Sequence, residues 1–155
     1  MGFRISGLPV SDFEGLFGLG DQTLAQRGVE RVHIVTPHAA PCRITLEDAE
    51  PGETVLLLNY EHQPADTPYR SRHAIFVRET AGETFDTVDV VPDAIRRRLL
   101  SVRAFDVGHR MIDADLVEGS ALEKLLEPML AREHVAYVHL HYARRGCFAA
   151  RAERT

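Results

Sequence analysis

The chain has 155 residues, of which 45% are hydrophobic and 26% charged, and a formal net charge of −5. This composition is typical of a soluble globular protein, and the length predicts a single domain over residues 1–155 that folds without metal or disulfide staples. The acidic balance argues against a general nucleic-acid binder, and no apolar run approaches the roughly 20 residues that span a bilayer.

The first third of the chain predicts short elements. Residues 3–6 are expected to form a strand, and Ser11 and Asp21 to cap two short helices. Residues 29–36 alternate in side-chain character, as VERVHIVT, which favours a strand. Residues 42–46 are expected to be briefly extended.

The middle of the chain predicts two strands joined by a long connection. Residues 54–60 form a continuous apolar run, which favours a strand buried on both faces. Residues 73–78 are expected to form the next strand. The polar segment 61–72 between them is long for a hairpin loop, so it is interpreted as a lid, an interface arm or an ordinary exposed loop.

The last third predicts helices around a hairpin. Pro92 is expected at the first position of a helix, and residues 101–106 and 111–117 are expected to pair as a hairpin. A capping box that starts at Ser120 predicts the clearest helix, which Pro128 should kink or divide. Strands outnumber helices and several connect by short turns. This favours an α+β fold, with a largely antiparallel or mixed sheet and about three short helices, over a doubly wound parallel sheet.

The histidine-rich strand expected between residues 135 and 148 is the most informative segment. Side chains alternate along a strand, so Tyr137, His139 and His141 share one face, with the two imidazoles about 7 Å apart. Neutral imidazoles bind metals or transfer protons. A metal would need a third ligand, and the candidates are Glu61, His62, His73, Asp113 and Asp115. The alternative is that both histidines form hydrogen bonds within the fold.

Arginine is the residue expected to hold an anion, because Lys124 is the only lysine and a guanidinium binds carboxylate or phosphate in a bidentate manner. Arg144 and Arg145 are the best candidates, since a turn can gather them near the histidines. Most other arginines are expected to pair with acidic residues or to be solvated. Cys147 follows this pair and is a candidate thiol, although no recognised nucleophile signature surrounds it.

The absence of an export signal in the first ten residues predicts a cytoplasmic protein. Cys42 and Cys147 are far apart in the sequence, and in a reducing compartment they are expected to be free thiols.

Four blocks of the sequence resemble a bacterial family catalogued as domain of unknown function 1203. They are FRISGLPVSDFEGLFGL, PCRITLEDAEPGETVLLLNYEH, PYRSRHAIFVRE and AYVHLHYARRGCFAAR. The likeness spans nearly the whole chain and implies a small, single-domain bacterial protein. It implies no catalytic residues.

The leading hypothesis is a protein that binds a small anionic ligand in a pocket lined by histidine and arginine, with a histidine as general acid or base if it is an enzyme. The candidate catalytic residues are His139, His141 and His73. The candidate binding residues are His62, Tyr69, Arg70, Arg144, Arg145 and Cys147. No metal ligand set is assigned, and the sequence names no cofactor and no reaction. The alternatives are a non-catalytic interaction or structural protein, such as a homodimer, and a His-x-His metal-binding protein.

Overall fold

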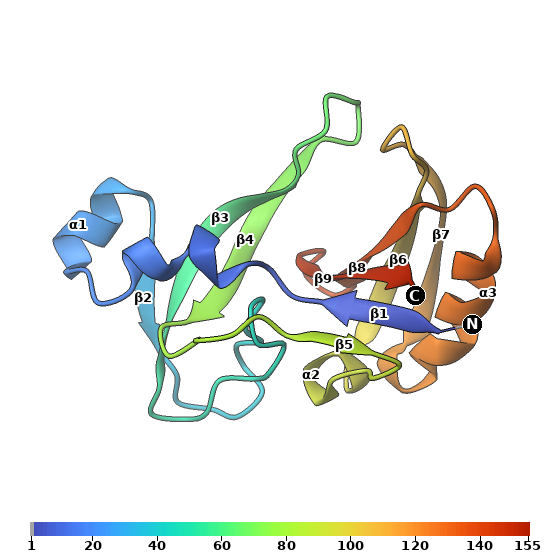
Figure 1. Cartoon of the computed structure of the whole chain (residues 1–155). Helices are drawn as coiled ribbons and strands as arrows, with labels where there is room; N and C mark the ends of the chain where they lie inside the picture. Colours follow the sequence, from blue (N-terminus) through green and yellow to red (C-terminus); the bar gives the residue numbers. More distant parts are fainter. Residues whose placement is uncertain (1) are drawn as a thin grey trace.

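The computed structural model describes residues 2–155 and confirms an α+β fold built on two antiparallel sheets (Figure 1). The strands are β1 (Phe3–Ser6), β2 (Glu30–His33), β3 (Thr54–Gln63), β4 (Ser71–Arg78), β5 (Asp86–Val88), β6 (Leu99–Phe105), β7 (Met111–Glu118), β8 (Tyr137–Tyr142) and β9 (Phe148–Arg154). The larger sheet has the order β5-β1-β9-β8-β6-β7 and the smaller one the order β2-β3-β4. The helices are α1 (Asp21–Gln26), α2 (Asp93–Arg96) and α3 (Leu122–Ala131).

The larger sheet buries one face under α3 and turns the other toward the smaller sheet (Figure 1). Val138 and Leu140 of β8 pack with Leu126 and Leu130 of α3 in the main core. Burial of each such side chain stabilises the fold by about 1.5–3 kcal/mol. Because strand residues alternate, the histidines of β8 must lie on the face opposite α3.

A second core lies on the smaller sheet. Leu56 and Ile75 from β3 and β4 pack there with Phe13 and Leu24 from the N-terminal segment. Phe148 at the start of β9 joins the same cluster, although β9 belongs to the larger sheet. The side chain of Phe148 therefore connects the two sheets close to the predicted histidine and arginine residues.

The connection between β3 and β4 is shorter than predicted. β3 continues to Gln63, with an irregular register after Tyr60, and β4 begins at Ser71. His62 consequently lies on a strand rather than on a loop. The expectation that residues 54–60 are buried on both faces was wrong, since Asn59 is exposed.

Other local expectations also needed correction. Residues 42–46 form a turn, in which Leu46 adopts a φ of 54°, instead of an extended segment. Within residues 2–155, no side-chain cap forms at the start of α1, α2 or α3: Gly20 precedes α1 and Ala121 precedes α3. Pro128 lies inside α3, and the helix is not divided there. Tertiary packing sets these boundaries more strongly than the local signals do.

Between residues 2 and 155, no helix combines the length and the apolar character required to cross a lipid bilayer.

Candidate functional site

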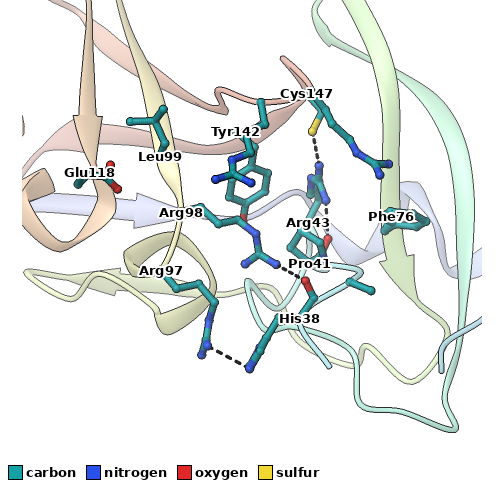
Figure 2. A pocket seen from close by; sticks show the side chains of 13 residues that line it. His38, Pro41, Arg43, Phe76, Arg97, Arg98, Leu99, Glu118, Tyr142 and Cys147 are labelled. Atoms are coloured by element: carbon teal, nitrogen blue, oxygen red, sulfur yellow. Dashed lines mark hydrogen bonds between the residues drawn. The ribbon is translucent and has the colours of Figure 1, made fainter. Parts of the chain in front are cut away.

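A hollow of about 590 Å³ lies where the turn after β8 meets the segment 38–43 and the start of β6 (Figure 2). We call it the arginine pocket. Its basic lining residues are Arg43, Arg97, Arg98, Arg144 and Arg145. Tyr142 and Cys147 also line it, and Glu118 is the acidic lining residue. The lining is therefore strongly cationic, although the chain as a whole is acidic.

Arg43 is the central residue of the pocket and is only 2% exposed. Its Nε donates to the carbonyl oxygen of Phe148 at 2.7 Å, and its Nη1 donates to that of Pro41 at 2.5 Å. Its Nη2 donates to the sulfur of Cys147 at 2.9 Å, and its guanidinium lies over the Tyr142 ring, 4.9 Å from the centroid. None of the ion pairs within residues 2–155 involves this guanidinium.

Arg97 and Arg98 share one carboxylate. Asp48 accepts from Arg98 at 2.6 Å and lies 3.3 Å from Nε of Arg97. The Arg98 guanidinium also donates to the carbonyl oxygen of His38, while His38 Nδ1 lies 3.2 Å from Asp48. One negative charge therefore serves two guanidiniums, so this side of the pocket keeps an excess of positive charge.

The hydroxyl of Tyr142 is buried in the pocket lining and has no hydrogen-bond partner among the described residues. Burial raises the pKa of Tyr142 to about 12, while the nearby Arg43 and Arg98 act in the opposite direction. The group therefore stays protonated near neutral pH and can donate a hydrogen bond. An unsatisfied buried hydroxyl costs about 1–3 kcal/mol, which makes it an unusual feature of a folded protein.

The turn after β8 is held from both sides. Gly146 adopts a φ of 78°, a left-handed conformation that favours glycine, and its N–H donates to the carbonyl oxygen of Tyr142 at 2.8 Å. His141 donates through Nδ1 to the carbonyl oxygen of Gly146 at 3.0 Å. These bonds present Arg144 and Arg145 at the surface and Cys147 toward the interior.

His62, His139 and His141 form a second group, which we call the histidine cluster. The His62 ring lies 5.0 Å from His141 and 6.1 Å from His139, between ring centroids, and it stacks on Phe148 at 5.3 Å. Burial is the main cause that lowers the pKa of His139 to about 2, that of His141 to about 3 and that of His62 to about 4. The positive charge of Arg103 lowers all three further. All three imidazoles are therefore neutral near pH 7.

A smaller cavity of about 280 Å³ adjoins the histidine cluster. His62, His139 and Tyr137 line it, and the Nδ1 atoms of both histidines have no partner. The Tyr137 hydroxyl, in contrast, accepts from Gln63 Nε2 at 2.9 Å and lies 2.8 Å from Nδ1 of His109.

Among residues 2–155, no group of three or more His, Cys, Asp or Glu side chains is arranged to hold a metal ion. Two of the carboxylates considered as third ligands are engaged elsewhere, Glu61 with Arg70 and Asp113 with Arg132. The positive charge of Arg103 beside the imidazoles also opposes a cation.

The residues predicted from the sequence do not share one cavity. Arg144, Arg145 and Cys147 line the arginine pocket, whereas His62 and His139 line the smaller cavity, with His141 buried beside it. The other three predicted residues, Tyr69, Arg70 and His73, line neither. Arg70 forms an exposed ion pair with Glu61. The Tyr69 ring packs edge-on against the Phe105 ring, with 6.5 Å between their centroids.

Sequence reasoning missed most of the pocket. Arg43 was one of six arginines considered as anion ligands, but most of these were expected to pair with acidic residues or to be solvated, and it was not chosen. The basic run 96–98 at the end of α2 was not connected with the site. A fully buried arginine has no local signature, because its burial depends on segments that are about 100 residues apart.

A family model described as "Protein of unknown function (DUF1203)" matches residues 39–154, well over half of the chain. The matched range contains Arg43, Tyr142 and Cys147 as well as the histidine cluster. No curated protein and no solved structure matches the chain.

Proposed function

The chain belongs to the DUF1203 family of proteins of unknown function, and we propose that it binds a small anion in the arginine pocket. The ligand class is a phosphate or a di- or tricarboxylate, whose oxygens suit the planar guanidinium group. The free thiols of Cys42 and Cys147 support the further proposal that it does so in the reducing cytoplasm.

The observation that carries this proposal is the buried guanidinium of Arg43. A charge removed from water is costly unless an opposite charge or hydrogen-bond acceptors compensate it. Arg43 has two carbonyl oxygens and a sulfur as acceptors but no carboxylate. Arginine cannot shed its proton to relieve this cost, so an anionic ligand is the natural source of the missing compensation.

The remainder of the pocket fits the same ligand. Arg144 and Arg145 are exposed at its edge and free of ion pairs within the described residues, so they can attract an anion from solution. The buried hydroxyl of Tyr142 supplies an unused donor. A volume of about 590 Å³ falls within the range of small-molecule sites.

The histidines support binding less well than the arginines do, and they support acid–base catalysis poorly. An efficient general acid or base has a pKa near the working pH. The pKa values of His139 and His141 are lowered to about 2 and about 3, so both imidazoles are neutral at neutral pH: neither is present as an imidazolium acid, and both are weak bases. We therefore assign the proposed function to the arginine pocket alone.

Calorimetric titration with inorganic phosphate tests the proposal, with malonate as the dicarboxylate probe. The Arg144→Gln/Arg145→Gln double variant should bind at least about tenfold more weakly, because each charge-assisted hydrogen bond contributes about 1.5–3 kcal/mol. The matched control is Arg70→Gln/Arg72→Gln, which removes the same charge from exposed residues outside the pocket. Its affinity should change by less than about twofold at moderate salt.

The proposal fails if the wild-type protein binds neither probe, or if the control variant loses as much affinity as the pocket variant. The second result would mean that the whole surface, and not this pocket, attracts the anion. The rival hypothesis of a non-catalytic homodimer requires no anion site, so the absence of binding would favour it.

A further inference from the structure

Cys147 places a sulfur atom inside the arginine pocket, in contact with its most buried cation. Nη2 of Arg43 donates to Sγ at 2.9 Å. In Figure 2 the Arg43 side chain points from the segment below toward this sulfur, with the Tyr142 ring beside it. A guanidinium forms its strongest hydrogen bonds with anionic acceptors, and the thiolate is the nucleophilic form of cysteine.

The other cysteine has a different environment. Cys42 has no exposed surface and lines neither cavity. Its sulfur accepts from the backbone N–H groups of Ile44 and Arg78, which are neutral donors. The chain thus contains an internal control, because one thiol borders a cationic hollow and the other is enclosed by the fold.

The backbone on both sides of Cys147 is fixed by side chains. His141 donates to the carbonyl oxygen of Gly146, the residue before Cys147. Arg43 donates to the carbonyl oxygen of Phe148, the residue after Cys147. Two anchored carbonyl groups restrict the position of the sulfur, which lowers the ordering cost of a reaction at that atom.

A second observation indicates that the same pocket takes a ligand. The hydroxyl of Tyr142 is buried in the same lining without a partner, in a residue that is only 6% exposed. A protonated hydroxyl beside Arg43 can donate to an oxygen anion or to a leaving group.

We propose that Cys147 is a nucleophile that attacks an electrophilic carbon of an anionic substrate bound in the arginine pocket. This inference takes its substrate class from the proposed function. The thiol proton first passes to solvent. A sulfur lone pair then forms the S–C bond, while the bond from that carbon to the leaving group breaks and its electron pair departs with the leaving group. Arg43 holds the sulfur, and Tyr142 donates to the developing negative charge.

Alkylation of the full-length protein by iodoacetate, which is anionic, and iodoacetamide, which is neutral, tests the proposal. In both reactions sulfur displaces iodide from carbon, and peptide mass mapping reports each cysteine separately. In the folded protein Cys147 should react at least about tenfold faster than Cys42. Its preference for iodoacetate over iodoacetamide should exceed that of the denatured chain by about tenfold, since a cationic hollow concentrates anions. Inorganic phosphate should slow its alkylation.

The outcomes separate the two proposals. If Cys147 in the folded protein reacts no faster than Cys42 with either reagent, the nucleophile is refuted, even where phosphate binds. If Cys147 reacts rapidly with both reagents but shows no charge preference and no protection by phosphate, the nucleophile stands and the anion site fails. Cys147→Ser must abolish the fast phase; a fast phase that persists in this variant overturns the assignment to Cys147.

Discussion

The arginine pocket and the histidine cluster meet at Phe148, yet burial affects their basic groups in opposite ways. In the histidine cluster, burial lowers the pKa of each imidazole and leaves it neutral. In the pocket, Arg43 is buried as deeply but keeps its charge, because a guanidinium is not deprotonated in proteins. Neutral imidazoles are stable in a closed interior, whereas a permanent charge requires acceptors or a ligand. The difference locates the proposed site among the arginines.

The largest effect expected from this comparison is on the pH dependence of the free energy of unfolding. His139 and His141 have folded pKa values of about 2 and about 3, below the ordinary value of 6.5, so the unfolded chain binds their protons first. Their contribution is complete above pH 6.5 and is lost as the pH falls toward the folded values. Each should cost about 2 kcal/mol in the free energy of unfolding between pH 7 and pH 5, or about 4 kcal/mol together. His62, whose pKa is lowered to about 4, should add up to about 2 kcal/mol more, because its ring is only partly buried and solvent screens it.

Urea unfolding at the two pH values measures this loss. The His139→Gln variant should lose about 2 kcal/mol less than the wild type between pH 7 and pH 5, whereas His134→Gln, at an exposed position, should behave as the wild type. Carboxylates contribute little to the change in stability between pH 7 and pH 5. The pKa of Glu79 is lowered to about 2, mainly by its hydrogen bond with Arg31, and this group changes the free energy of unfolding only below about pH 4.5. An unchanged stability between pH 7 and pH 5 would show that the cluster is hydrated.

The next test removes the buried charge from the pocket. Arg43→Met leaves the carbonyl oxygens of Phe148 and Pro41 without these donors, and we expect a loss of about 3 kcal/mol in the free energy of unfolding. Arg72→Met, at an exposed position, should change it by less than about 0.5 kcal/mol. Added phosphate should raise the melting temperature of the wild type but not that of Arg43→Met. Equal shifts in the two proteins would contradict a role of Arg43 in binding.

Two tyrosines allow a matched test across the two regions. Tyr137→Phe, beside the histidine cluster, loses hydrogen bonds with Gln63 and His109 and should destabilise the protein by about 1 kcal/mol. Tyr142→Phe removes a hydroxyl that has no partner, so stability should stay equal or rise by up to about 1 kcal/mol. The same variant should bind phosphate several-fold more weakly. Equal destabilisation by both substitutions would show that the Tyr142 hydroxyl is already satisfied, for example by water.

Local patterns were sufficient to predict the fold class and most strands. The hairpin of β6 and β7 and the alternation of β8 follow from side-chain periodicity, and both agree with the structure. Boundaries were less accurate where a long-range contact decided them. His62, for instance, lies on β3 because the strand extends past its register irregularity to Gln63.

The site was predicted less well than the fold, for a physical reason. The turn after β8 is local, and Arg144, Arg145 and Cys147 do line one pocket. The partner that makes this pocket unusual, Arg43, approaches from more than 100 residues away in the sequence. Sequence periodicity does not encode that approach. It also does not show that His139 and His141 of β8 are buried apart from the arginine pocket and do not line it.

The smallest predicted effect concerns the internal competitor for the proposed ligand. Asp48 neutralises part of the charge of Arg97 and Arg98, so Asp48→Asn should raise the affinity for phosphate about threefold while lowering stability by about 1 kcal/mol. Asp86→Asn is the matched control, because it removes an equal charge from an exposed pair with Arg4, and it should leave the affinity unchanged. Calorimetric titration of the three proteins measures the affinities, and urea unfolding measures the stabilities. If Asp48→Asn binds phosphate more weakly, the carboxylate orients the two guanidiniums for the ligand and does not compete with it.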